Sequence, residues 1–336
     1  MRKRHFQIGW DEQPQTKVLI ETWPGFDPND WLATLHDQLA HWEQSVQIRF
    51  VRNRWERYVL ASEAHVYVST CLSADFLVQA KSLQWVYLAI GGTEFLEDLN
   101  VPRHIKIITA AGISATGVAE HTIGLMIALD RRFDLAVRRQ LKWIWDQSDI
   151  LENIQGLRGR TVGLIGLGRN GRAIAALSKA LGMRVIALDV RSDLFIEGLE
   201  ALYNREQLLE LLECSDFAIL CLPLTRATQG MIGKKELEAL GPNSYLINVA
   251  RGGLVDEKAL AWALRHGVIR GAALDVLSEE PSSRLSPLRG CPNLIVTPHV
   301  AGNIYTFREE IRRRFARNLK AFLNGDNLEE GMLLNF

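Results

Sequence analysis

The sequence of 336 residues lacks three features that would each indicate a particular class of protein. Its charge is balanced, with 39 basic and 39 acidic residues, so no excess of one sign favours a nucleic acid or a membrane surface as a partner. The four cysteines are far apart, without a C-x-x-C pair or a zinc-binding spacing, which argues against a disulfide scaffold and a metal site. No apolar run approaches the roughly 18–20 residues that a membrane span needs.

What is present indicates an ordinary globular protein. The N-terminus is basic and then polar, without the apolar core of a signal peptide, and the cysteine usage fits a reducing compartment. We therefore expect a cytoplasmic location. Hydrophobic residues make up 47% and charged residues 23%, and this length allows two domains that each have their own core.

The first third of the chain alternates between strand and helix patterns. An amphipathic helix is predicted over 28–43, with Leu32, Leu35, Leu39 and Trp42 at helical spacing. Apolar runs predict five strands, at 17–21, 46–51, 64–69, 83–90 and 105–109. Strands that alternate with helices favour a parallel sheet covered on both faces, so this part is predicted to be one small doubly wound unit.

A second series follows a long helix predicted from Ala115 to about Leu141. Six strands are predicted, at 161–165, 184–188, 217–220, 244–248, 271–274 and 294–297. Six strands with intervening helices describe a Rossmann sheet, which binds a dinucleotide. The last predicted helix, 307–323, has no strand after it. We therefore predict an α/β fold with two doubly wound parallel-sheet domains.

The strongest local motif is the glycine-rich stretch GLGRNG at 166–171, between a strand and a helix. Gly166 would permit the tight turn, Gly168 the close approach of a pyrophosphate, and Gly171 the packing of the helix on the strand. The helix N-terminus offers free N–H groups to phosphates. Asp189, eighteen residues after Gly171, ends the next strand and can accept hydrogen bonds from ribose hydroxyls. This favours NAD over NADP, although Arg191 weakens the preference.

Three chemically active residues follow strands of the second series: Arg251, Glu280 and His299. Taken singly they suit a surface ion pair, a solvated turn and a turn cap. Open α/β sheets, however, bind ligands beyond the carboxyl ends of their strands, so the three can converge. The arginine fork suits a carboxylate, the imidazole can exchange a proton, and the glutamate would favour the charged imidazole. Together they predict a hydride-transfer site for an α-keto acid.

The motifs also carry a resemblance. The glycine-rich loop with Asp189, VARGGLVDE at 249–257, LDVLSEEP at 274–281 and TPHVAG at 297–302 resemble, in order and spacing, the D-isomer-specific 2-hydroxyacid dehydrogenases. VAEH at 118–121 and CLPLTRAT at 221–228 are similar as well. The resemblance covers nearly the whole chain. It implies that Arg251 orients the substrate, that His299 donates the proton, and that Glu280, directly before the proline, is its partner in preference to Glu279.

The same resemblance implies a domain arrangement and an assembly. Residues 1–112 and 301–336 would form a discontinuous, flavodoxin-like substrate-binding domain, and residues 113–300 the NAD-binding Rossmann domain. The final helix would return to the first domain, which explains why no strand follows it. The family is usually dimeric through the nucleotide domain, so we expect a homodimer with the helix that begins near Val118 at the interface.

The resemblance further implies where cofactor and substrate bind. Asp275 would bind the nicotinamide carboxamide, and Val249 and Ala250 would line the nicotinamide pocket. The full set of predicted cofactor-binding residues is Thr116, Gly166, Gly168, Arg169, Asn170, Gly171, Asp189, Leu222, Pro223, Thr228, Val249, Ala250 and Asp275.

The substrate loops differ from the usual family pattern. GGTE stands at 91–94 where members often have Ala-Gly-Val-Asp, yet the backbone N–H groups of Gly91 and Gly92 could still receive a carboxylate. Cys71 lies in a small, uncharged loop after the third strand. With Arg251, these residues are the predicted substrate contacts. Since no basic residue stands in the loop at Cys71, a small acid such as glyoxylate or hydroxypyruvate is favoured over a phosphorylated one.

Alternatives remain open from the residues alone. An NAD-sensing protein on the same fold is one, because a transcriptional corepressor of this family keeps the three active residues; turnover of keto acids would separate the two. Formate dehydrogenases pair their histidine with glutamine, so Glu280 argues against that chemistry. His104, His121 and His266 have no acidic partner at a useful spacing and are expected to be structural or exposed. Cys221 is expected to be a buried packing group.

Overall fold

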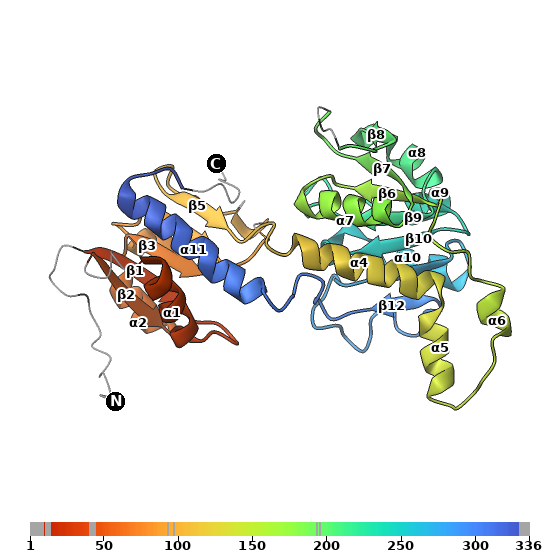
Figure 1. The fold of residues 1–336 in the computed structure, drawn as a ribbon, viewed down its shortest axis with the longest axis horizontal. Coiled ribbons are helices and arrows are strands. Elements are labelled where there is room, and N and C mark those ends of the chain that lie inside the picture. The colour runs from red at the N-terminus through yellow and green to blue at the C-terminus, as the bar shows by residue number, and fades with distance from the viewer. Residues whose placement is uncertain are drawn as a thin grey trace. The chain divides into compact units, whose positions relative to one another are not determined.

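Two crossings divide the chain into two units. The computed structural model describes residues 10, 15–39, 45–92, 94–96, 98–192, 194 and 196–328. Unit 1 is Met1–Ile113 with Tyr305–Phe336, and unit 2 is Ser114–Ile304 (Figure 1). The second crossing lies later than the predicted boundary at residue 301. The reason is that Val300 and Ala301 are hydrogen-bonded through their N–H groups to Asp275, which holds this segment in unit 2.

Unit 1 is built on a parallel sheet whose five strands have the order β2-β1-β3-β4-β5. The strands are β1 Thr16–Glu21, β2 Val46–Val51, β3 Val66–Ser69, β4 Trp85–Leu88 and β5 Lys106–Thr109. All five were predicted to within two residues at each end. This order is that of flavodoxin-like sheets, which confirms the predicted doubly wound architecture.

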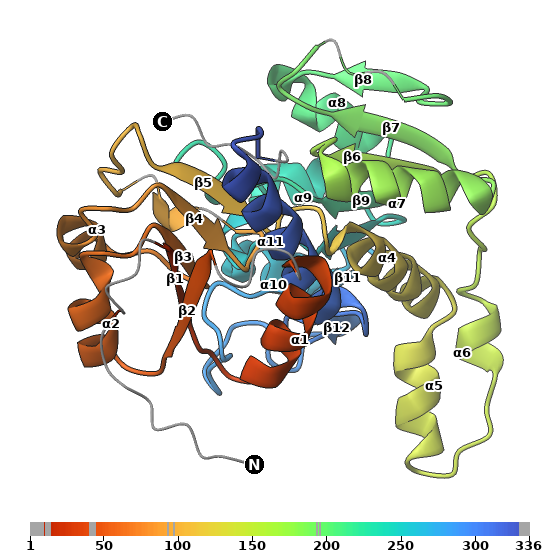
Figure 2. The same cartoon turned by 60° about the vertical axis from the view of Figure 1, so that its left-hand side comes forward.

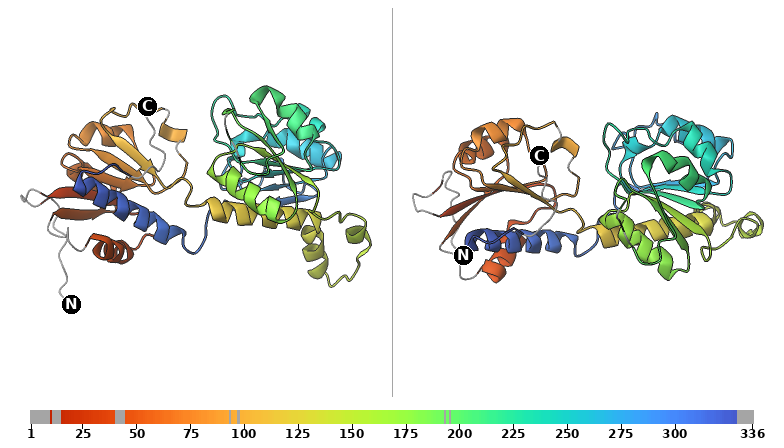
Figure 3. Two further views of the ribbon diagram at one scale, coloured as in Figure 1. Left: turned by 45° about the horizontal axis from the view of Figure 1, so that its top comes forward. Right: turned by 90° about the horizontal axis from the view of Figure 1, so that it is seen from above.

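Helices cover both faces of this sheet (Figure 3). On one face lie α1 Pro28–Leu39 and α11 Phe307–Asn324, packed on Val18 and Ile20; on the other lie α2 Arg54–Ala61 and α3 Ala74–Gln79, packed on Leu19. A 3₁₀ turn, η1, covers Glu94–Leu96. Leu32 was predicted on the apolar face of α1, but its side chain is 45% exposed. Trp31, which is 3% exposed, is buried there with Leu35 and Leu39 instead. Trp42 lies outside the described residues.

Unit 2 is built on a parallel sheet of seven strands in the order β12-β11-β10-β9-β6-β7-β8. The strands are β6 Thr161–Ile165, β7 Arg184–Leu188, β8 Ala201–Tyr203, β9 Phe217–Leu220, β10 Tyr245–Asn248, β11 Gly271–Leu274 and β12 Leu294–Val296. This is the Rossmann order with one further strand beyond β11. Six of the seven were predicted. β8 was missed because its three residues are half-buried throughout and form no distinct apolar run.

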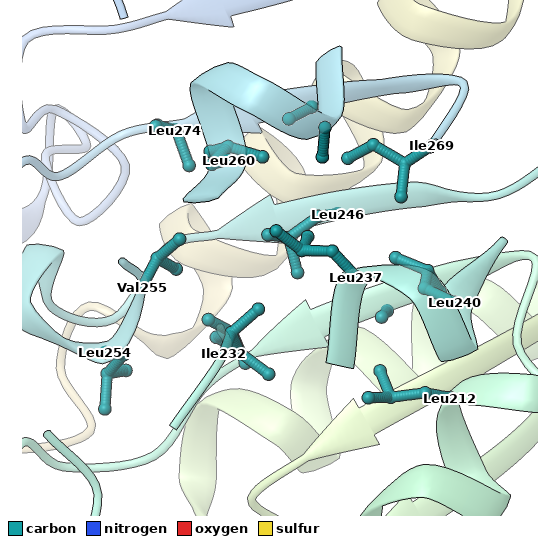
Figure 4. Packing of buried hydrophobic residues seen from close by; sticks show 14 of the residues in the cluster. Leu212, Ile232, Leu237, Leu240, Leu246, Leu254, Val255, Leu260, Ile269 and Leu274 are labelled. Atoms are coloured by element: carbon teal, nitrogen blue, oxygen red, sulfur yellow. The ribbon is translucent and has the colours of Figure 1, made fainter. Parts of the chain in front are cut away.

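Two apolar layers enclose this sheet. α4 Ala115–Asp130 and α7 Arg169–Ala180 cover one face, and α8 Leu208–Glu213, α9 Lys234–Leu240 and α10 Glu257–Arg265 cover the other. Figure 4 shows Leu237 and Leu260, from two of these helices, in one apolar cluster with Leu246 of β10. Each fully buried leucine contributes about 1.5–3 kcal/mol, so the layers hold the strand ends in fixed positions. The short 3₁₀ turns η2 Arg205–Gln207 and η3 Gly252–Leu254 complete the unit.

The single long helix predicted over 115–141 is wrong. α4 ends at Asp130 and a separate helix, α5, begins at Phe133, because Arg132 adopts a left-handed backbone with φ +55°. The Arg132 guanidinium is held by Asp134 and by Asn293 of the loop before β12. α5 Phe133–Gln140 and α6 Ser148–Leu151 extend from the body of unit 2 (Figure 2). None of the helices in the described ranges combines the length and apolarity that a bilayer crossing requires.

Candidate active site

The glycine-rich loop joins β6 to α7. Gly166 has φ +103°, a conformation that side chains other than glycine rarely adopt, and a Cβ on Gly171 would lie 2.2 Å from the Gly166 carbonyl oxygen. Both glycines are therefore required by the turn itself. A Cβ on Gly168, by contrast, would meet no atom within 4 Å. The loop thus leaves open space at the position where a pyrophosphate is expected.

The loop stands at the topological switch point of the sheet. β6 lies between β9 and β7, so the strand order reverses here, and ligands of open α/β sheets bind at such points. Arg169 and Asn170 form the first turn of α7, and the N-terminal turn of a helix is a favourable place for a phosphate. Leu222 and Pro223 follow β9 on the other side of the reversal. Thr228 shapes that loop, since its hydroxyl donates to the Pro223 carbonyl at 2.9 Å.

Asp189 follows the end of β7 directly and contacts the glycine-rich loop. Its Oδ2 accepts a hydrogen bond of 2.8 Å from the N–H of Leu167, and Arg191 donates to the same carboxylate from its backbone N–H, Nε and Nη2 at 3.0–3.1 Å. Burial acts to raise the pKa of Asp189, but the hydrogen bonds from Arg191 and Leu167 outweigh it and lower the pKa. A ribose hydroxyl would therefore bind a carboxylate that already interacts with Arg191.

Cys221 follows β9 and packs against the underside of the same loop. Its Sγ lies 2.9 Å from the Gly166 carbonyl oxygen. Burial, with a smaller contribution from the negative charge of Asp189, raises the pKa of the Cys221 thiol to about 12. The residue therefore remains a neutral thiol at ordinary pH and supports the turn.

His299 and Glu280 meet at the carboxyl edge of the sheet. Arg251, Glu280 and His299 follow β10, β11 and β12, which are adjacent parallel strands. The Nδ1 of His299 lies 2.7 Å from Oε2 of Glu280, and Oε1 of the same carboxylate accepts a 2.9 Å hydrogen bond from the N–H of Leu277. The second bond fixes the orientation of the carboxylate. Both side chains are accessible, with 53% of His299 and 37% of Glu280 exposed, so a ligand can reach them.

The Arg251 loop packs directly on the segment that holds Glu280. Arg251 precedes Gly252, and a Cβ on Gly252 would lie only 1.9 Å from the carbonyl carbon of Leu277. The backbone at Gly252 therefore lies so close to the backbone at Leu277 that no side chain fits between them. Arg251 Nη1 donates to the Ala250 carbonyl at 2.7 Å. Val249 and Ala250, predicted to line the nicotinamide pocket, are buried just before it.

His299 lies in a turn that is built on Asp275. The backbone of His299 is left-handed, with φ +54°, and its N–H donates to the Asp275 carbonyl at 2.8 Å. The Asp275 carboxylate is 2% exposed and accepts from the N–H groups of Val300 and Ala301 at 3.0 and 2.9 Å, and from the Thr297 hydroxyl at 2.6 Å. The residue predicted to bind the carboxamide therefore also holds the histidine turn.

His121 also belongs to this cluster, although no acidic residue stands at a useful spacing from it in the sequence. From α4, its Nε2 lies 3.0 Å from the Thr297 hydroxyl and 3.5 Å from Oδ1 of Asp275. Spacing could not reveal this, because 176 residues separate His121 from Thr297. The VAEH motif was the available signal. His104 is exposed, and His266 is exposed with its ring bonded to a carbonyl of its own helix, as expected.

The remaining predicted contacts lie at the ends of strands in unit 1, except Thr116, which is exposed in the first turn of α4. Cys71 follows β3, and its N–H donates to the Ser69 hydroxyl at 3.1 Å. Gly91 and Gly92 follow β4, the strand next to β3, so these loops share one edge of the sheet. Gly91 is exposed and Gly92 half-buried, which leaves their backbone accessible.

Comparison with known proteins agrees with this geometry. A family described as D-isomer specific 2-hydroxyacid dehydrogenase, NAD binding domain, matches residues 123–301. The chain is 34% identical over 261 residues to the glycerate dehydrogenase of Methylorubrum extorquens, over 76% of this chain and 80% of that protein.

Solved structures agree as well. A D-isomer specific 2-hydroxyacid dehydrogenase family protein from Aeromonas salmonicida superposes with a TM-score of 0.79 at 29% identity, over 94% of this chain and 98% of that one. The NADPH-dependent glyoxylate/hydroxypyruvate reductase of Sinorhizobium meliloti, solved with NADP and sulfate, gives 0.78 at 25% identity, over 94% and 97%.

A Rossmann sheet with its glycine-rich loop, a histidine–glutamate pair at the strand ends, and matches over most of the chain lead to one conclusion. The protein belongs to the D-isomer-specific 2-hydroxyacid dehydrogenase family, oxidoreductases that transfer a hydride between a nicotinamide cofactor and a 2-hydroxy or 2-keto acid.

Proposed function

We propose that this enzyme reduces a small 2-keto acid, with glyoxylate and hydroxypyruvate as the first candidates, and that Arg251, Glu280 and His299 carry the chemistry. The 2.7 Å contact between His299 and Glu280 is the observation on which the proposal chiefly rests. A histidine whose one ring nitrogen is held by a carboxylate can present the other to a substrate as a proton donor. A bound nicotinamide supplies or accepts the hydride.

The proton moves through His299. Nδ1 of His299 donates to Glu280, so Nε2 is the nitrogen that can give its proton to the carbonyl oxygen of the substrate. The Glu280 carboxylate holds the imidazole in this orientation. Its second oxygen is held by Leu277, so the carboxylate does not have to reorient during the reaction. Oxidation of the hydroxy acid uses the same groups in reverse.

Arg251 binds and orients the substrate. Its guanidinium offers a planar pair of donors that matches a carboxylate, and one of its N–H groups can polarise the carbonyl next to it. The Nη1 bond to the Ala250 carbonyl keeps the side chain close to its own strand end. Restricting the arginine in this way lowers the entropy lost when a substrate binds.

The cofactor would be held by the glycine-rich loop, the first turn of α7 and Asp189. The open space at Gly168 and the helix N-terminus at Arg169 and Asn170 fit a pyrophosphate. Asp189 favours NAD(H), since its negative charge repels a 2′-phosphate. Arg191 lies against Asp189 and would moderate that preference. Asp275 would bind the carboxamide of the nicotinamide.

A substrate of two or three carbons suits the predicted loops. The N–H groups of Gly91 and Gly92 would receive the carboxylate, and the loop at Cys71 offers no positive charge for a phosphate. The names of the Methylorubrum glycerate dehydrogenase and the Sinorhizobium glyoxylate/hydroxypyruvate reductase support acids of this size.

We also propose a cytoplasmic homodimer that assembles through unit 2. The α5–α6 region exposes several large apolar side chains, which single subunits rarely leave in water. They are Phe133, Val137, Leu141, Trp143, Ile144, Trp145 and Leu151, and Trp145 is fully exposed. Light scattering over a range of protein concentrations tests the assembly.

A panel of 2-keto acids, assayed with NADH and NADPH side by side, tests the proposed reaction. We expect turnover with glyoxylate or hydroxypyruvate and a lower KM for NADH than for NADPH. His299→Asn should lower kcat by roughly 10²–10⁴-fold while the Kd for NADH stays unchanged. Tight NADH binding without turnover of any keto acid by the unaltered protein would instead indicate a sensor, and full activity in His299→Asn would remove the proton-donor role.

A further inference from the structure

One face of α4 packs along the turn that carries His299. Gly117 and His121 are four residues apart, so they lie on the same side of the helix. A Cβ on Gly117 would lie 3.2 Å from the Ala301 carbonyl oxygen and 2.5 Å from the side chain of Ile304. One helical turn later, the ring of His121 reaches Thr297 at the other end of the turn. The helix therefore contacts the turn on both sides of His299.

The direction of the hydrogen bonds in this contact can be assigned. The Thr297 hydroxyl has one proton, and a carboxylate can only accept, so that proton is donated to Oδ1 of Asp275 at 2.6 Å. Nε2 of His121, at 3.0 Å from the same hydroxyl oxygen, must then be the donor. The chain of donors runs from His121 to Thr297 to Asp275.

The Asp275 carboxylate, which accepts the last of these hydrogen bonds, also binds the turn. Its oxygens accept from the N–H groups of Val300 and Ala301, and its carbonyl accepts from the N–H of His299. A left-handed backbone costs a residue such as histidine about 1–3 kcal/mol, so the surroundings must impose it. Asp275 imposes it from both sides of His299, and the orientation of its carboxylate depends on Thr297 and His121.

We infer that His121 is a positioning residue: through Thr297 it orients the Asp275 carboxylate, and so fixes the turn that presents the His299 imidazole to Glu280. This inference rests on the proposed proton-donor role of His299. It assigns His121 no contact with substrate or cofactor. A catalytic group displaced by about 1 Å can lose about 10²-fold in rate, so a distant bond of this kind has a measurable effect on kcat.

Four single variants, one double variant and a control test the inference. His121→Leu and Thr297→Val remove the donor and the hydroxyl with little change in volume, and each should lower kcat by roughly 10–100-fold. His121→Gln and Thr297→Ser keep a donor and a hydroxyl, so they should recover most of that loss. The double variant His121→Leu/Thr297→Val should be no slower than the slower single variant, because both remove one chain. His266→Leu, at the end of α10 where the ring is bonded to the Trp262 carbonyl, is the matched control and should keep full kcat.

Each variant is measured for kcat and KM with glyoxylate and hydroxypyruvate, for the Kd of NADH and for Tm. Unchanged kcat in His121→Leu and Thr297→Val overturns the inference. A decrease in kcat that is equally large in His121→Gln and Thr297→Ser overturns it as well. If His121→Leu does not fold, Thr297→Val and Thr297→Ser still decide. If His299→Asn loses turnover while the variants at 121 and 297 keep it, the positioning role alone is wrong. If His299→Asn keeps full turnover, the proposed function is wrong.

Discussion

Gly252 lies at the point where the loop of Arg251 contacts the loop of Glu280, and Gly252→Ala should push the two loops apart. The new Cβ would lie 1.9 Å from the Leu277 carbonyl carbon, 2.1 Å from its oxygen and 2.3 Å from the N–H nitrogen of Ser278. All three atoms belong to the backbone and cannot rotate away. The Ser278 N–H is also bonded to Glu257 at 2.7 Å, which ties this segment to α10. The two segments must therefore move apart as whole pieces of backbone.

The size of the effect follows from these distances. Ordinary van der Waals contact begins at 3.4 Å, which is 1.5 Å more than the 1.9 Å that the Cβ would have. Misplacement of a catalytic group by about 1 Å can cost about 10²-fold in rate, so kcat/KM should fall by roughly 10²-fold or more. Overpacking costs about 1–3 kcal/mol in stability, or roughly 2–12 °C in Tm for a unit of this size.

Steady-state kinetics with a keto acid and NADH, together with thermal unfolding, measure both effects. Gly253→Ala is the matched control, because the atoms nearest to its Cβ belong to the Leu224 side chain, with Cδ2 at 2.9 Å, and that side chain can rotate away. It should keep most of the activity. Native kcat/KM in Gly252→Ala, or an equal loss in Gly253→Ala, would refute the close contact between the loops as the reason for the effect.

Two further predictions concern the cofactor edge and the thiols. Asp189→Ala removes the charge that repels a 2′-phosphate and releases Arg191, so the ratio of the Kd values for NADPH and NADH should fall by about tenfold or more; an unaltered ratio in fluorescence titrations would count against the ribose role. Because burial raises the pKa of the Cys221 thiol to about 12, exposed Cys71 and Cys214 should react first with a thiol reagent at pH 8. In the unfolded chain Cys221 ionises near pH 8.5, so its contribution to stability is complete below about that pH and is lost as the pH rises toward 12. Between pH 7 and pH 10, the free energy of unfolding measured with urea should therefore decrease less in Cys221→Ala than in the unaltered protein. Equal decreases would contradict this.

Most strands of this fold were predictable because they contain apolar runs, many of them buried on both faces. Apolar runs such as TVGLI at 161–165 have no other consistent interpretation, and their alternation with helices determines a parallel sheet. The break after Asp130 was not predictable. Arg131 and Arg132 both favour helices, and the left-handed turn at Arg132 depends on Asn293, far along the chain.

The site divides in the same way. Residues that follow strands could be located from the sequence, because the carboxyl ends of parallel strands meet at one edge. Interactions across the sheet could not: neither the pairing of Asp189 with the loop at Leu167 nor the contact of His121 with Thr297 is visible in local spacing. Groups at strand ends can therefore be placed from the sequence, whereas the contacts that orient them are visible only in the structure.

The left-handed backbone of His299 determines which substitutions at this position report on chemistry alone. Asparagine adopts positive φ more readily than most residues, so His299→Asn removes the imidazole with little strain in the turn. A β-branched residue such as valine would add a backbone penalty to the loss of the proton. Comparing asparagine, alanine and valine at position 299 therefore separates proton transfer, read from kcat, from conformational strain, read from Tm. Glycine adds a fourth case, in which the proton donor is lost while the turn is relieved of strain.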